Sequence, residues 1–302
     1  MKKAVTYLAL VATLLISNVK AGDKKCRGLA MSGGSNRATW EAGVIWGLLH
    51  HGDPADFAWD VVSGISAGAI NTGQMSVWKV GDELAMSEAM SDAYASINTE
   101  ETLFTTWKGD APTIEKVALT LPDYIAGKYV SLLDDSNAIS FLKEQFKNST
   151  GYGRRWTTGS IDANTGRFIT MNQTNCEFED LPTCTLASGS IPAALPPQHW
   201  NGHILADGGT LWDINIDSAI NQCLDIVDDP ADIIIDIIIC WDHTPNKQEV
   251  SKDAFTNWKS ARNIRDYWFG PASIEQEKRS HINVNYQYYF GLHHIHERCP
   301  TP

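Results

Sequence analysis

Positive charge is scarce in this 302-residue sequence. Its 24 lysines and arginines face 36 aspartates and glutamates, which gives a formal net charge of −12 at pH 7. Nucleic acids and anionic lipid surfaces attract cationic proteins, so this balance argues against both as electrostatic partners. The chain also lacks a Pro/Ser-rich linker, a low-complexity tract and an internal repeat. We therefore expect one domain, although a chain of this length is also long enough for two.

Long apolar runs are absent beyond the N-terminal segment. Two lysines precede an apolar stretch over residues 4–19, and Val19-Lys20-Ala21 has the small-x-small pattern of a cleavage site. A membrane span needs about 20 apolar residues, and this stretch is shorter. We predict a signal peptide over residues 1–21 and a secreted chain over residues 22–302. An uncleaved anchor is the alternative.

Cysteine motifs for metal or redox chemistry are absent as well, because no pair has C-x-x-C or zinc-ligand spacing. The six cysteines all follow the predicted signal, and an even count in a secreted chain favours disulfides. Cys176 and Cys184 are close enough to close a loop, and Cys26 with Cys299 would join the two ends. The sequence does not fix this pairing. Two N-x-[ST] sequons make the chain a candidate glycoprotein in a host that glycosylates.

Two other segments contain residues of metal-ligand type. His293, His294 and His296 lie near the C-terminus, where such a cluster is more often an exposed polar tail. Residues 225–232 are rich in aspartate, but their proline and their lack of glycine do not fit a calcium loop. We predict neither a metal nor another cofactor.

Apolar segments alternate with Gly-rich turns and helical patterns. Residues 27–32 and 59–62 predict strands, and each is followed by a turn and then by a helix, over residues 38–50 and 67–78. This alternation is typical of an α/β protein. Further expected elements are a helical region over 82–146 broken near 109–112 and at Pro122, a strand pair over 156–162 and 167–172, a strand over 204–206 and a helix over 214–224.

The run IIIDIIICW over residues 233–241 is almost continuously apolar. Such a run is typical of a central parallel strand covered on both faces. Asp236 interrupts it, and we expect this side chain to be a satisfied structural group rather than a catalytic one.

The second turn is Gly64-Ile65-Ser66-Ala67-Gly68, a G-x-S-x-G pattern directly after a predicted strand. In a nucleophile elbow the flanking glycines permit the strained turn that exposes a serine Oγ at a helix N-terminus. Ser66 is therefore the candidate nucleophile. It needs a base and a set of N–H donors for the oxyanion.

A base and an oxyanion loop are both present in the sequence. Asp207 and His243 follow Ser66 in the order of an α/β-hydrolase, but that fold sets several strands before its nucleophile, and only one βα unit fits here. Gly33 and Gly34 follow a predicted strand and open a helix, so their amides suit an oxyanion. A phosphate-binding loop is the alternative, but G-x-x-x-x-G-K-[ST] and G-x-G-x-x-G are absent.

Four segments together resemble the patatin-like phospholipases, a secreted family of lipid acyl hydrolases. MSGGSNRATWEAGVIWGLL is similar to the family's oxyanion loop, VVSGISAG to its nucleophile elbow, ASGSIPAALPPQ to its small-residue helix and Pro-ended loop, and LADGG to its D-G-G/A block. The resemblance implies a three-layer patatin-like α/β fold with a central, mostly parallel sheet flanked by helices. It also implies a single catalytic domain over residues 22–302, with a recognisable core of about 27–241.

The resemblance further implies the site. The family uses a Ser-Asp dyad without histidine, so Ser66 would be the nucleophile and Asp207 its base. The oxyanion-hole amides would come from Gly33, Gly34 and Ser35. The supporting residues would be Arg37, Gly64, Gly68, Gly208 and Gly209.

The chain departs from the family's loop pattern at two positions. Ser35 and Ala38 stand where the family usually has glycine. If Ser35 adopts a positive φ it will be strained, although its N–H remains a donor. Arg37 matches the loop's arginine, and either holds the loop or faces a lipid phosphate; the structural role is the one we favour.

The activity implied by the resemblance is hydrolysis of fatty-acyl esters of phospholipids or lysophospholipids, with neutral acylglycerols as alternative substrates. Such an enzyme meets a membrane or micelle surface peripherally, and Trp107 is a candidate contact. The helical spacing of Trp40 and Trp46 places both toward the core. Two other functions stay open: a catalytically silent lipid-binding or storage protein on the same scaffold, and an acyltransferase that uses the same acyl-enzyme.

Overall fold

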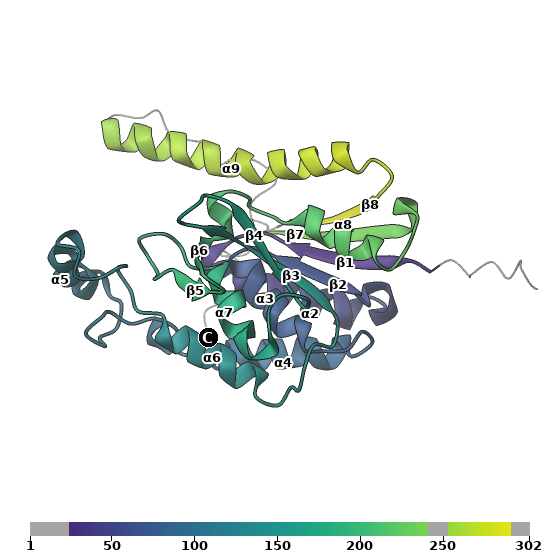
Figure 1. Ribbon diagram of the computed structural model, residues 1–302, viewed down its shortest axis with the longest axis horizontal. Coiled ribbons are helices and arrows are strands. Elements are labelled where there is room, and N and C mark those ends of the chain that lie inside the picture. The colour runs from purple at the N-terminus through teal and green to yellow at the C-terminus, as the bar shows by residue number, and fades with distance from the viewer. Residues whose placement is uncertain (1–23, 241–252, 291–302) are drawn as a thin grey trace, which may run out of the picture.

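A computed structural model describes residues 24–240 and 253–290 of the chain (Figure 1). The predicted signal peptide, His243, the C-terminal histidine cluster and Cys299 lie outside these residues. Within the described residues, an eight-stranded sheet runs through the middle of the fold. Its strands are β1 (Cys26–Met31), β2 (Val61–Gly64), β3 (Arg155–Asp162), β4 (Phe168–Asn172), β5 (Gln198–Trp200), β6 (His203–Asp207), β7 (Ile233–Ile239) and β8 (Asn285–Phe290).

The sheet is mostly parallel, as predicted. The strand order is β5-β6-β3-β2-β1-β7-β8, with β4 beside β3. The run from β3 to β8 is parallel throughout, whereas β4, β5 and β6 pair antiparallel. The isoleucine run forms β7, which lies between β1 and β8, so the expectation of an interior parallel strand is confirmed.

Helices cover both faces of the sheet, which confirms the predicted mixed α/β class (Figure 1). Helices α8 (Ile216–Leu224) and α9 (Ala254–Ser280) lie over one face. The other face carries α2 (Ala38–His51), α3 (Ala67–Ser76) and α7 (Leu181–Ala187), with α4 (Glu83–Ala95) and α6 (Ser136–Phe146) packed outside them. Helix α5 (Ile114–Ile125) projects from one end. Among the helices described, none is both long enough and apolar enough to cross a bilayer.

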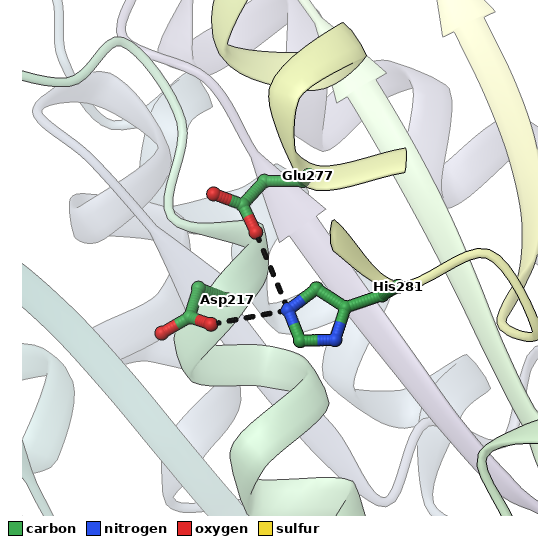
Figure 2. A group of neighbouring side chains, drawn as sticks. All are labelled: Asp217, Glu277 and His281. Carbon is green, nitrogen blue, oxygen red and sulfur yellow. Dashed lines mark hydrogen bonds and ion pairs between the residues drawn. The ribbon is translucent and has the colours of Figure 1, made fainter. Parts of the chain in front are cut away.

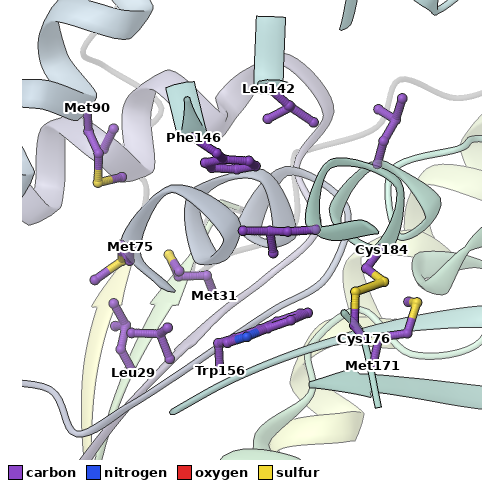
Figure 3. Packing of buried hydrophobic residues seen from close by; sticks show 14 of the residues in the cluster. Leu29, Met31, Met75, Met90, Leu142, Phe146, Trp156, Met171, Cys176 and Cys184 are labelled. Carbon is purple, nitrogen blue, oxygen red and sulfur yellow. A yellow bond between two sulfur atoms is a disulfide. The ribbon is translucent and has the colours of Figure 1, made fainter. Parts of the chain in front are cut away.

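Each face of the sheet buries its own apolar cluster. Side chains alternate along β1, so Leu29 and Met31 join the cluster under α2 and α3, while Cys26 and Ala30 join the one under α8. Trp156 on β3 is fully buried in the first cluster (Figure 3). The sheet is thus the middle layer of three, and the ends of its strands are left to build a site.

Two local expectations are wrong. Pro122 does not break the helical region, because it lies in the last turns of α5, where the loss of one N–H donor interrupts little of the ladder. Trp40 packs against the core as expected, but Trp46 is 37% exposed and stacks on His50. The break near residues 109–112 is confirmed, since α5 begins at Ile114.

One of the two predicted cysteine pairings is present in the structure, and the other is not. Cys176 and Cys184 form a disulfide, as their spacing allows. Cys26 is bonded to Cys223, 197 residues away, which joins β1 to α8 and rules out the link to Cys299. Cys240 is a buried free thiol. Two disulfides are compatible with an extracellular or secretory location.

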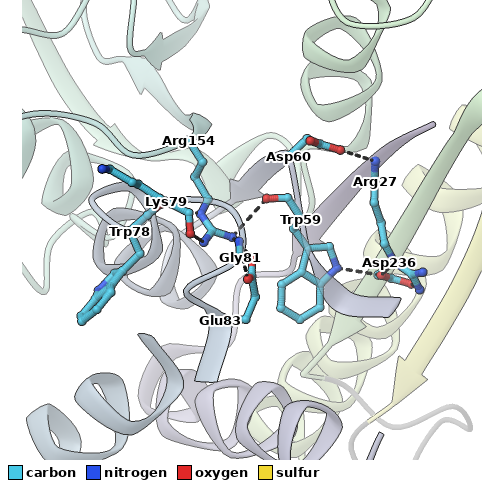
Figure 4. Close-up of polar contacts among 9 residues, drawn as sticks. All are labelled: Arg27, Trp59, Asp60, Trp78, Lys79, Gly81, Glu83, Arg154 and Asp236. Atoms are coloured by element: carbon cyan, nitrogen blue, oxygen red, sulfur yellow. Dashed lines mark hydrogen bonds and ion pairs between the residues drawn. The ribbon is translucent and has the colours of Figure 1, made fainter. Parts of the chain in front are cut away.

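Asp236 is a structural group, as expected. It is fully buried on β7 and accepts hydrogen bonds from Arg27 Nε at 2.6 Å and from Trp59 Nε1 at 2.7 Å (Figure 4). Its charge is therefore balanced by a guanidinium within the sheet layer.

Candidate active site

Ser66 lies at a sharp turn between β2 and α3, with φ 52° and ψ −113°. This is a strained conformation for an L-residue, and such strain is concentrated at functional sites. The two flanking positions have no room for a side chain, so both must be glycine. A Cβ on Gly64 would lie 2.1 Å from the Gly68 carbonyl oxygen, and one on Gly68 would lie 2.6 Å from the Met31 carbonyl oxygen.

Asp207 ends β6 and faces the serine. Ser66 Oγ donates to Asp207 Oδ2 at 2.8 Å, and the other carboxylate oxygen accepts the Gly209 N–H at 2.6 Å. Only 7% of Ser66 and 5% of Asp207 is exposed, so the pair is largely shielded from water. Gly208 has no room for a side chain, since a Cβ there would lie 2.1 Å from the Gly159 carbonyl oxygen.

Burial raises the pKa of Asp207 to about 6, and the hydrogen bonds from Ser66 and Gly209 limit the rise. A carboxyl group with this pKa is still mostly ionised at neutral pH. It is also a stronger proton acceptor than an ordinary aspartate, which suits a general base.

Ser188 holds the backbone of the serine turn in place. Its Oγ accepts the Ser66 N–H at 3.0 Å and donates to the Gly159 carbonyl oxygen at 2.5 Å. Two residues later, the Ser190 carbonyl oxygen accepts the Asp207 N–H at 2.9 Å. Both serines belong to the small-residue stretch singled out in the sequence, but neither has a spacing signal of its own.

The Gly-rich loop lies beside the serine, because a Cβ on Gly33 would lie 3.6 Å from Ser66 Cβ. The Gly33 amide donates to the Asp213 carbonyl oxygen at 2.8 Å, so this donor is already engaged. Within residues 24–240 and 253–290, the amides of Gly34 and Ser35 have no acceptor. Ser35 has φ 55°, so the condition stated for backbone strain at this position is met.

Arg37 closes the same loop through its backbone. It ends the short helix η1 (Ser35–Arg37), and its N–H donates to the Gly34 carbonyl oxygen at 3.1 Å. Its side chain is exposed. This contact belongs to the backbone, and the role of the Arg37 side chain stays a prediction.

A buried polar network joins α2 to α3 behind the loop. Asn71 Nδ2 donates to Glu41 Oε2 at 2.9 Å, and Tyr94 Oη donates to Asn71 Oδ1 at 2.6 Å. Burial raises the pKa of the Glu41 carboxyl well above its usual range, and the hydrogen bonds that it accepts lower the pKa only in part. This network fixes the two helices whose N-terminal ends meet at the site.

A separate cluster of metal-ligand type lies between α8 and α9 (Figure 2). His281 Nε2 is 3.3 Å from Asp217 Oδ1 and 3.6 Å from Glu277 Oε2. The three residues line a cavity of about 360 Å³ whose lining includes neither Ser66 nor Asp207. The contacts among these three side chains account for their arrangement without a metal.

Comparison with known proteins agrees with this architecture. The family model described as patatin-like phospholipase matches residues 29–220. The chain therefore belongs to the patatin-like phospholipase family.

Other comparisons add little detail. No curated protein sequence matches the chain. Among solved structures, the crystal structure of VipD from Legionella pneumophila matches with 13% identity and a TM-score of 0.38. That match covers 88% of this chain and 61% of the VipD chain, so this chain spans less than two thirds of the length of VipD.

Proposed function

We propose that the protein hydrolyses fatty-acyl esters of phospholipids or lysophospholipids, with Ser66 as the nucleophile and Asp207 as the general base. One observation carries the proposal: the 2.8 Å hydrogen bond from the Ser66 hydroxyl to a buried carboxylate. A serine hydroxyl is a weak nucleophile alone, and a base in direct contact removes its proton as it attacks. No histidine is needed between the two.

The reaction proceeds in two halves. Ser66 Oγ attacks the ester carbonyl carbon while its proton moves to Asp207, and the amides of Gly34 and Ser35 hold the oxyanion. The tetrahedral intermediate collapses, the C–O bond to the alcohol breaks, and the leaving oxygen takes the proton from Asp207. Water then attacks the acyl-enzyme while it gives a proton to Asp207. The second tetrahedral intermediate collapses, the C–O bond to Ser66 breaks, and Ser66 Oγ takes the proton from Asp207, which releases the fatty acid and restores both residues.

We further propose that this activity resides in a single secreted domain over residues 22–302, formed after removal of residues 1–21. The two disulfides support an oxidising location.

Labelling with a fluorophosphonate tests the assignment of the nucleophile. We expect mass spectrometry of the digested protein to place the adduct on Ser66, and Ser66→Ala to abolish labelling. Ser63→Ala is the matched control, because Ser63 lies in the same segment and donates instead to the Asn215 carbonyl oxygen. An adduct on another serine, or none on the folded wild type, would contradict the proposal and favour a silent lipid-binding protein.

A further inference from the structure

Helix α5 has an apolar face that no part of the described structure covers. Ile114, Ala118, Leu121 and Ile125 recur at helical spacing and form one stripe. Ile114 is 91% exposed and Ile125 is 76% exposed. A neighbouring face of the same helix, with Val117, Thr120 and Tyr124, is buried or half-buried. The exposed stripe is therefore not the face that holds the helix in place.

The two ends of the segment that carries α5 are held together by backbone hydrogen bonds, and we call these joined ends the base of the segment. Thr105 and Asp134 exchange backbone hydrogen bonds of 3.1 and 2.8 Å, which closes the excursion over residues 106–133. Trp107 stacks on Tyr129 at 5.5 Å and donates to the Ser131 carbonyl oxygen. The tryptophan expected at a lipid surface thus belongs to this base, and the exposed apolar groups are on the projecting helix (Figure 1).

The same excursion is attached to the proposed catalytic site. The Leu132 and Leu133 amides donate to the carbonyl oxygens of Ala193 and Ala194 at 2.9 and 3.0 Å. These alanines lie in the loop that begins at Ser188, whose hydroxyl holds the Ser66 N–H. The base of the α5 segment is thus continuous with the loop that contacts the serine turn.

We infer that α5 docks the enzyme on a zwitterionic phospholipid surface by inserting its 114–125 stripe among the lipids. The inference rests on the proposed function, since a phospholipid substrate is presented as a surface. A net charge of −12 gives no attraction to lipid head groups, so burial of apolar side chains has to drive docking. An amphipathic helix lying in the interface plane does this, with its apolar face buried and its charged face in water.

Flotation with phosphatidylcholine vesicles tests docking apart from turnover when every protein carries Ser66→Ala. We expect Ile114→Glu/Ile125→Glu to lower the vesicle-bound fraction at least tenfold, because two isoleucines lose their burial in lipid. Ile282→Glu is the matched control, since Ile282 is 79% exposed but lies outside α5, and its binding should not change. Equal binding by the double variant and its parent would overturn the inference.

Turnover by proteins that keep Ser66 completes the test. The double variant should hydrolyse the soluble ester p-nitrophenyl butyrate as the wild type does, and lose vesicle hydrolysis about tenfold. Loss of both activities would overturn docking, because the substitutions would then act on the site or the fold. A wild-type dimer in light scattering that the double variant abolishes would assign the face to a second copy instead. Vesicle binding that depends on α5, without any ester turnover, would contradict the proposed function while supporting the docking role.

Discussion

Arg154 Nη1 lies 3.0 Å from Glu83 Oε1, and both side chains are buried (Figure 4). The guanidinium also donates to the carbonyl oxygens of Trp59, Trp78 and Lys79. Arg154 therefore joins the start of β3 to the start of α4 and to the chain before β2. Its burial lowers the pKa of the guanidinium, and the nearby Glu83 carboxylate opposes this.

Removing the acid partner should destabilise the protein strongly. Glu83→Ala leaves a buried guanidinium without its counter-charge, and breaking such a pair costs about 3–5 kcal/mol. Urea unfolding followed by tryptophan fluorescence measures the change. Glu88→Ala on the same helix is the control, because that carboxylate is 66% exposed and its loss should matter by less than about 0.5 kcal/mol. A similar loss in both variants would contradict the argument.

Asp207→Asn should be inactive yet more stable than the wild type at alkaline pH. The pKa of Asp207 is about 6 in the folded protein against an ordinary value of 3.8, so the folded state holds its proton more tightly than the unfolded state. The group's contribution to stability therefore falls as pH rises from about 4 to 6, by about 3 kcal/mol in total.

Unfolding free energies at two pH values test this. Asn keeps the shape of the side chain without the buried charge, so we expect a gain approaching 3 kcal/mol at pH 8 and none near pH 3.5. A variant that is less stable than the wild type at pH 8 would show that the folded site does not disfavour the carboxylate.

The same pKa predicts the pH dependence of turnover. Asp207 accepts a proton only when it is ionised, so kcat/KM on a soluble ester should rise through about pH 6 and level off above pH 7. An activity that stays flat between pH 4.5 and pH 8 would exclude a base with this pKa.

The two disulfides should contribute unequally. Cys26–Cys223 spans 197 residues and Cys176–Cys184 spans eight, and constraint of the unfolded chain grows with loop length. Loop-closure entropy predicts losses of about 5 and about 2.5 kcal/mol when each pair is changed to alanine. All four cysteines are buried, so the two double variants are matched in packing. The reverse order in chemical denaturation would contradict this ranking.

Local sequence patterns predicted the serine turn, because its conformation depends on residues that are close together in the sequence. Gly64 is required by a close backbone contact within its own turn and Gly68 by a close contact with Met31 on the neighbouring strand β1, but both glycines stand out in the local G-x-S-x-G pattern, so the strand, the turn and the helix could be predicted there. Asp207 lies 141 residues from Ser66, and only the resemblance to a family linked the two. Ser35 stands where glycine is usual in the family, and that resemblance raised the question of a positive φ, which the structure answers with 55°.

Features that depend on tertiary packing could not be predicted. The Gly33 amide donates to the Asp213 carbonyl oxygen. This contact joins two loops that are far apart in the sequence, so no local residue pattern predicts it. Cys26 meets Cys223 only because α8 packs over β1. The α5 pattern indicates an amphipathic helix, but periodicity alone implies that its apolar face is buried, and the structure exposes it.

The most direct test of the account is fatty-acid release from phosphatidylcholine and lysophosphatidylcholine by the wild type and by Ser66→Ala, with EDTA present. The account predicts release by the wild type and a loss of at least about a thousandfold in Ser66→Ala, with unchanged circular dichroism. Equal release by both proteins, or none by a folded wild type, would contradict the assignment of Ser66 as the nucleophile of a lipid acyl hydrolase.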